Sequence, residues 1–217
     1  MKKLLLIAVL LLPVIPALAH VINYDPDAVP AKQVFLNYLL LGFEHIIPAG
    51  LDHILFILCI FFLNTNIRKV ILQATMFTLA HSVTLGLAMY GVIKPAAGII
   101  EPLIALSIVF LAVENILSDK VKPWRIIMVF LFGLVHGMGF AAAISGTGMP
   151  SYAFAEALLG FNIGVELGQL SIILFMYFFV SKMLSGKIWY RPRIVIPISA
   201  VIALIAAYWT VERIFFA

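Results

Sequence analysis

Charged residues are scarce in this chain, and their scarcity excludes a soluble protein. Of the 217 residues, 64% are hydrophobic and only 11% are charged, whereas soluble domains carry about 25% charged residues. So few charges cannot cover a soluble domain of this length, and the chain must be solvated by lipid. The formal net charge of +4 is spread over short loops, which indicates membrane topology and not nucleic-acid binding.

Further absences narrow the class of protein. The single cysteine, Cys59, has no partner in the sequence, so an intrachain disulfide is excluded. The long apolar runs lack the alternation of polar and apolar residues that membrane-spanning strands need. The signatures H-E-x-x-H and G-x-S-x-G are missing, and so is the Walker loop. Without an ATP-binding element, any transport is passive or driven by an ion gradient.

The N-terminus has the pattern of a signal peptide over residues 1–19. Two lysines precede a short apolar run, and an A-x-A cleavage site ends it at Ala19. An uncleaved first helix is the alternative, and cleavage is favoured because prolines shorten the apolar run. Cleavage makes His20 the N-terminus of the mature protein. We expect residues 20–33, which are polar and contain prolines, to form a short external segment.

Residues 34–217 are predicted to form a single all-α domain, a polytopic bundle of six transmembrane helices. A helix needs about 20 apolar residues to cross the hydrocarbon core. Six apolar segments meet this length, near 34–63, 69–92, 96–117, 125–145, 153–181 and 194–216. The first segment is longer than one span needs and contains Pro48 and Gly50. Because proline removes a backbone hydrogen bond, we expect this first helix to be broken near Pro48–Gly50.

Lysine and arginine residues alternate along the chain in a way that predicts the topology. They gather in the first, third and fifth connections, at Arg68, Lys69, Lys120, Lys122, Arg125, Lys182, Lys187, Arg191 and Arg193. Short basic loops remain in the cytoplasm. We therefore expect the mature N-terminus and the C-terminus to be external.

Ionisable residues inside the apolar segments are mostly acidic: Glu44, Asp52, Glu101, Glu114, Glu156, Glu166 and Glu212, with Arg213 as the one base. Each such group costs at least ~2.5–3.5 kcal/mol in the bilayer and usually marks a site or an ion pathway. The surplus is negative, so a bound cation or protons must neutralise it. Glu114 is open to two interpretations, either a group on an exit path or a carboxylate at a helix end beside Lys120.

Some of these polar groups share one depth. With the predicted topology and a rise of about 1.5 Å per residue, four segments place a common set near their middles: Asp52, His53, His81, His136 and Glu166. Imidazoles and carboxylates in this number can complete the coordination shell of a divalent first-row metal. We expect a metal site there, because neutral imidazole suits Ni, Co, Zn or Cu, and the absence of a nearby thiolate argues against a soft Cu(I) site. The competing interpretation is that each histidine is structural and hydrogen-bonded.

Other polar residues are predicted to assist this site. The acidic and imidazole groups nearer the external surface are interpreted as a path to it, namely Glu44, His45, Glu101 and Glu156. Groups at helical spacing from the site are predicted to support the ligands, namely Thr78, Ser82, Asn162 and Gln169. For the hydroxyls, bonding to their own helix is the alternative.

Three glycines at four-residue spacing form a stripe on the fifth segment, at Gly160, Gly164 and Gly168. Such a stripe lets another helix approach closely. We expect it to pack against a partner helix, in the same chain or in a second copy.

The motifs together resemble the HupE/UreJ family of bacterial membrane proteins. The matching stretches are GFEHIIPAGLDHILFIL (42–58), TLAHSVTLGLA (78–88), IEPLIALSIVFLAVEN (100–115), FGLVHGMGFA (132–141) and FNIGVELGQL (161–170). The family's histidine–aspartate–histidine motif corresponds to His45, Asp52 and His53, and its histidine–glycine motif to His136 and Gly137. The resemblance implies an inner-membrane protein of a bacterium, accessory to nickel enzymes and acting as a nickel or cobalt permease.

Three functions remain open from the sequence. The leading hypothesis is a permease for Ni²⁺ or Co²⁺ and not an enzyme. The second is an intramembrane hydrolase in which a His/Asp-held Zn²⁺ activates water and Glu166 is the general base. The third is a metal sensor or an assembly subunit that does not transport.

Overall fold

The computed structural model describes residues 29–63, 66–143 and 149–216, and these residues form helices and no strand. The predicted signal peptide, residues 1–19, lies outside the described residues, and so does most of the predicted external segment 20–33. The all-α prediction is confirmed, because every long apolar run in the described part of the chain is helical.

The first apolar segment forms two helices, α2 (Ala31–Ile46) and α3 (Leu51–Phe62), whose axes differ by 68°. This confirms the predicted break at Pro48–Gly50. A side chain at Gly50 has no room, because its Cβ would overlap the carbonyl oxygen of His45. The chain can therefore turn this tightly only with glycine at that position.

The other segments form longer helices. They are α4 (Ile67–Met89), α5 (Ala97–Leu117), α6 (Arg125–Ala143), α7 (Phe154–Met176) and α9 (Ile196–Phe215). A 3-10 turn, η3 (Ser151–Ala153), precedes α7, whereas η4 (Tyr177–Ser181) and α8 (Lys182–Leu184) continue it. The π-helical turn η5 (Arg191–Val195) leads into α9.

Five of these helical stretches are each long and apolar enough to cross a membrane, and the bent pair α2–α3 adds a sixth when it counts as one span. Many side chains on the outside of the bundle are large and apolar, such as Leu40 (60% exposed) and Leu204 (72% exposed). Lipid is the solvent that suits such a surface. The chain is therefore a multi-pass membrane protein.

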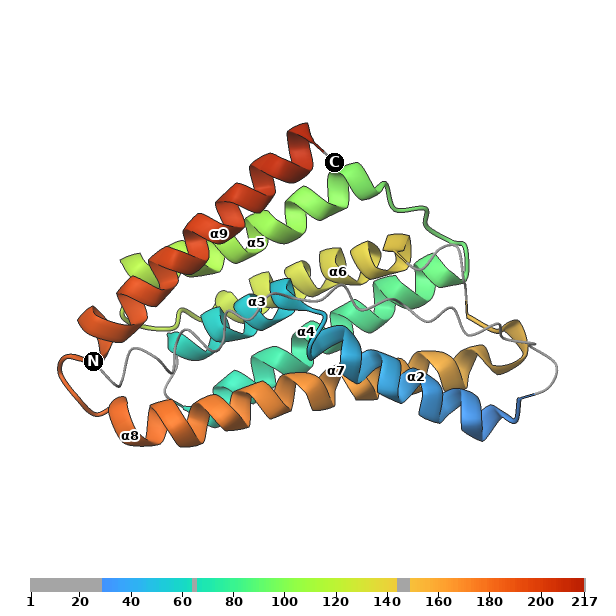
Figure 1. Cartoon of the computed structure of the whole chain (residues 1–217), viewed down its shortest axis with the longest axis horizontal. Helices are drawn as coiled ribbons and strands as arrows, with labels where there is room; N and C mark the ends of the chain where they lie inside the picture. The colour runs from blue at the N-terminus through green and yellow to red at the C-terminus, as the bar shows by residue number, and fades with distance from the viewer. Residues whose placement is uncertain (1–28, 64–65, 144–148, 217) are drawn as a thin grey trace.

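The helices are arranged so that the break lies in the middle of the bundle (Figure 1). α9 packs along α5 at one edge, α2 packs along α7 at the opposite edge, and α3, α4 and α6 lie between them. The loops rich in lysine and arginine lie at the end of the bundle where α8 is labelled, and we call this the basic end.

The predicted glycine stripe packs against α2 of the same chain. A Cβ on Gly160 or Gly164 would overlap backbone atoms of Phe35 or Leu39, and a Cβ on Gly168 would overlap the side chain of Ile46. Of the two partners considered, the helix in the same chain covers this face, so the face is not free for a second copy. The contact also fixes where the end of α2 lies.

Candidate metal site

The break between α2 and α3 brings two histidines to the centre of the bundle. His45 lies in the last turn of α2, and His53 lies in the first turn of α3. Their ring centroids are 4.6 Å apart, with the ring planes at 69°. On an unbroken helix these residues would lie more than two turns apart along the axis. The bend places them face to edge instead.

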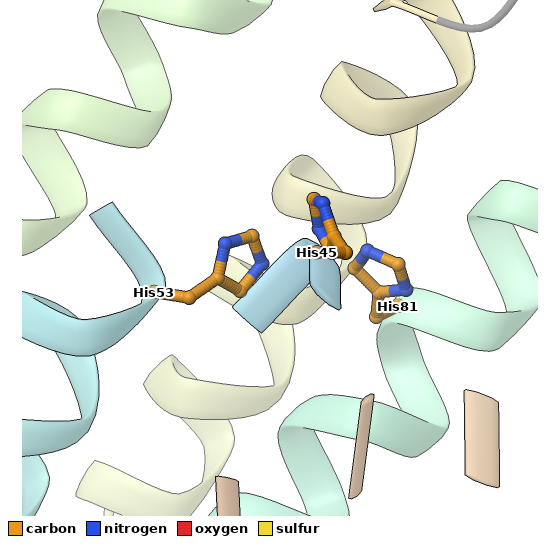
Figure 2. Close-up of side chains that lie close together, drawn as sticks. All are labelled: His45, His53 and His81. Atoms are coloured by element: carbon orange, nitrogen blue, oxygen red, sulfur yellow. The ribbon is translucent and has the colours of Figure 1, made fainter. Parts of the chain in front are cut away.

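His81, near the middle of α4, completes a group of three (Figure 2). One nitrogen from each of His45, His53 and His81 lies within 4.8 Å of the other two. His53 and His81 are 3% and 0% exposed, so water does not surround these rings. Three separate helices thus direct imidazole groups at one point.

His136 on α6 lies against the same group, with its ring centroid 5.0 Å from that of His53. Its Nε2 is 3.1 Å from the hydroxyl oxygen of Ser107 on α5. That hydroxyl donates its hydrogen to the carbonyl of Ile104, at 2.6 Å, so its oxygen is left to accept a hydrogen bond from His136. Nε2 therefore carries the proton, and Nδ1 keeps a free lone pair.

Asp52 fixes the orientation and the tautomer of His53, as Ser107 does for His136. One carboxylate oxygen of Asp52 accepts the backbone N–H of His53, at 2.9 Å, and lies 3.1 Å from its ring nitrogen Nδ1. Because a carboxylate accepts hydrogen bonds, Nδ1 carries the proton and Nε2 keeps the free lone pair. A carboxylate behind a ligating histidine is a recurrent feature of metal sites.

The remaining ring nitrogens are buried and have no hydrogen-bond partner among the described residues. They are Nε2 of His45, Nε2 of His53, both nitrogens of His81 and Nδ1 of His136. The side chain of Asn162 on α7 lies beside His81, just outside hydrogen-bond geometry. We call His45, His53, His81 and His136 the histidine cluster. A buried polar atom without a partner costs about 1–3 kcal/mol, and a metal ion bound by these nitrogens would remove that cost.

The donor set fits a transition metal in kind and nearly in spacing. Nitrogen ligands sit about 2.0–2.1 Å from such an ion, so donor atoms around one ion are ~3–3.5 Å apart. The observed spread of up to 4.8 Å is wider, so the donor atoms must move closer together to bind one ion.

Phenylalanine rings cover the histidine cluster on two sides. Phe140 and Phe161 stack at 4.5 Å and lie against His45, at 4.2 and 5.5 Å. Toward the basic end, Phe56 and Phe77 both contact the ring of His136, at 5.1 and 4.9 Å. These apolar walls separate the cluster from the two ends of the bundle.

Several residues that the sequence analysis assigned to the ligands or their support line a groove of about 280 Å³ between α4 and α7. They are Thr78, Ser82, Asn162 and Glu166. One oxygen of Glu166 accepts the Thr75 hydroxyl, at 2.6 Å. Thr78 and Ser82 donate to backbone carbonyls of their own helix, which is the alternative considered for hydroxyls. Glu166 is thus placed beside α4 and not within the group of three histidines.

The other assigned residues are more scattered. Gln169 on α7 is buried, with neither amide atom bonded to a described residue. Glu44 on α2 is exposed, and Glu101 and Glu156 are half-buried near the starts of α5 and α7. His45, which the sequence analysis assigned to the access path, lies in the histidine cluster because the helix break turns it inward.

Sequence reasoning placed two residues incorrectly. Ser107, which orients His136, was placed away from the site, although its position near the middle of the third apolar segment was a signal. Arg125 was counted as a loop base, whereas it begins α6 and is 0% exposed. Arg125 forms an ion pair with Glu114. The basic partner of this carboxylate is therefore Arg125 and not Lys120.

Comparison with protein families identifies the family of the chain. The family model for HupE / UreJ protein matches residues 23–213. The chain belongs to the HupE/UreJ family. Its members are associated with nickel and cobalt uptake and are generally transporters and not enzymes. Among curated proteins and among solved structures, none matches this chain.

Proposed function

We propose that this protein is a permease that binds Ni²⁺ or Co²⁺ in the histidine cluster during its passage across the membrane. The observation that carries the proposal is the convergence of buried imidazole nitrogens from separate helices, without partners among the described residues. In the middle of a bilayer, such groups are costly unless they serve an ion or a substrate.

The ligands we propose are the free nitrogens of the histidine cluster, with Asp52 holding His53 and supplying one negative charge. Imidazole nitrogen suits Ni, Co and Zn better than it suits Mg or Ca, which prefer oxygen. Cys59 lies about 9 Å beyond His53 along α3, so no soft sulfur ligand from this residue draws Cu(I) to the cluster.

Transport is favoured over hydrolysis by the backbone at the site. Broken helices near the bilayer midplane are typical of transporter binding sites, where the free ends of half-helices face the ion. A hydrolase would need a general base beside an open coordination position. The candidate base, Glu166, instead bonds Thr75 and lines the α4–α7 groove. Membership of a family of transporters supports the same choice.

We further propose that the basic end faces the cytoplasm of a bacterial inner membrane, with both mature termini external. The positive-inside rule supports this orientation. Single cysteines placed in the 118–124 loop of a Cys59→Ser protein should react with a membrane-impermeant maleimide only after the cells are opened. Labelling of this loop in intact spheroplasts would reverse the topology.

The direct test is metal content and uptake. Purified protein incubated with Ni²⁺ should retain an equimolar amount by mass spectrometry, and proteoliposomes should take the ion up. His81→Ala should lose both, because it removes a central ligand and leaves membrane insertion intact. His20→Ala is the matched control, since His20 is the one histidine of the sequence outside the cluster. Unchanged binding and uptake in His81→Ala would refute the proposal.

A further inference from the structure

A second buried polar cluster surrounds the guanidinium of Arg125, which is 0% exposed. Nε donates to the side-chain oxygen of Gln73, at 3.2 Å. Nη2 donates to the carbonyl of Cys59 and to the side-chain oxygen of Asn115, at 2.9 and 3.3 Å. Nη1 donates to the carboxylate of Glu114. We call these five residues the arginine cluster.

The groups around the guanidinium form a cage of oxygen atoms. They come from α3, α4 and α5, and one of them is anionic. The amide of Asn115 also donates to the Cys59 carbonyl, at 2.9 Å, so part of the cage is held without Arg125. The second oxygen of Glu114 is buried and has no partner among the described residues. Oxygens of this kind bind divalent cations, and here they hold the chain's own cation.

The arginine cluster lies between the histidine cluster and the basic end. On three helices the same order runs toward that end: His53, Phe56, Cys59 on α3; His81, Phe77, Gln73 on α4; and His136, Phe132, Arg125 on α6. Along α3 and α4, the two clusters are about 9–12 Å apart. The phenylalanine rings between them are in contact, with Phe56 4.7 Å from Phe77 and 6.2 Å from Phe132.

An ion that leaves the histidines toward the basic end therefore meets an apolar layer and then a fixed positive charge. A cation cannot enter the cage while the guanidinium occupies it, because both need the same oxygens and their charges repel. The oxygen cage therefore resembles a cation-binding site that the guanidinium of Arg125 already occupies.

We propose that the oxygen cage of Glu114, Asn115, Gln73 and the Cys59 carbonyl is an exit site for the divalent cation, and that Arg125 closes it as a tethered cation. The ion passes when the guanidinium leaves Glu114. This inference rests on the proposed permease function and assigns its gate.

The test removes the gate without leaving a charge unpaired. The double variant Arg125→Met/Glu114→Gln lacks both charges but keeps a side-chain oxygen at position 114, so the cage is vacated and still has its oxygens. Such neutral replacements of a buried pair usually keep the fold. The matched control is Arg191→Met/Glu212→Gln. Arg191 donates to the Ile116 carbonyl, at 3.0 Å, near the same end, and Glu212 lies on α9 outside both clusters.

Initial Ni²⁺ flux is measured in proteoliposomes with a trapped metal-sensitive dye, beside melting temperature and Ni²⁺ binding. The double variant should melt and bind as the wild type does, yet conduct at least about tenfold faster, a barrier change of ~1.4 kcal/mol. The control should match the wild type. Adding His81→Ala to the double variant should abolish the extra flux, because the ion then lacks its site upstream.

Arg125→Lys keeps the test decisive if the double variant fails to fold. Lysine retains the charge but not the planar fork, so it leaves cage oxygens free and should give a smaller rise in flux. Flux at or below the wild-type rate in either folded variant would overturn the gate. If the wild type itself binds no Ni²⁺, or His81→Ala binds normally, the permease proposal fails instead.

Discussion

The histidine cluster and the arginine cluster share α3, α4 and α6 and are both buried, yet their polar atoms are satisfied in opposite ways. The histidine cluster presents several nitrogen lone pairs with no donor among the described residues. The arginine cluster gives its guanidinium an oxygen partner at Nε and at both terminal nitrogens. A cluster that lacks donors is prepared for a ligand that comes from outside, whereas a cluster whose cation is already built in is closed to one.

The largest difference between the clusters is expected in stability. Glu114→Ala leaves the Arg125 charge buried without its anion, which should cost about 3–5 kcal/mol. His81→Ala leaves no charged partner behind and should cost clearly less. Unfolding of both variants in the same detergent gives the comparison. Equal losses would mean that the histidine cluster is as important for the fold as the arginine cluster.

A smaller loss of stability is expected from Gly164→Leu. This change inserts a side chain where α2 touches α7, and overpacking of this kind costs typically about 1–3 kcal/mol. Because α2 carries His45, Ni²⁺ affinity should fall together with the melting temperature. Gly98→Leu is the control, since a Cβ at Gly98 meets no atom within 4 Å. An unchanged melting point in Gly164→Leu would count against the packing role.

Residues that hold the imidazoles in place should have moderate effects on binding alone. Ser107→Ala and Asp52→Asn each remove the group that fixes one histidine tautomer. Losses of such groups typically lower metal affinity by about 10–100-fold. Isothermal titration with Ni²⁺ measures this, and Ser171→Ala, a serine bonded within α7, is the control. Full affinity in both variants would mean that the rings are held by packing alone.

The smallest effect is expected from Glu166→Gln. The amide oxygen can still accept the Thr75 hydroxyl, so the groove keeps its hydrogen bond. Ni²⁺ affinity should change by less than about tenfold, or ~1.4 kcal/mol. A loss as large as that of His81→Ala would place Glu166 among the ligands, which was the original expectation from its depth.

Depth along the helices predicted part of the candidate site. It selected His53, His81 and His136, and the ring centroid of His53 lies 6.0 Å from that of His81 and 5.0 Å from that of His136. It assigned His45 to a path, because depth was counted along a continuous helix and the bend returns that residue to the centre. It included Glu166, because depth does not tell which way a helix face points.

Other features were beyond such reasoning. Ser107 resembles any hydroxyl in an apolar helix, and only its contact with His136 distinguishes it. Arg125 resembles a loop base, since it closely follows Lys120, Lys122 and Pro123. It is buried because oxygens from three other helices surround it, and a sequence does not state which helices are neighbours.

The sequence by itself determined the class of the protein and the place of its break. Scarce charge and long apolar runs require lipid as solvent, and proline with glycine inside an overlong span requires a bend. The tertiary structure alone decided which histidines meet, which nitrogen of each ring is free, and which cation fills the oxygen cage. The reason is that periodicity and depth describe each helix by itself, whereas a site depends on how each helix is rotated toward its neighbours. Close packing, such as that of Gly164 against α2, sets that rotation.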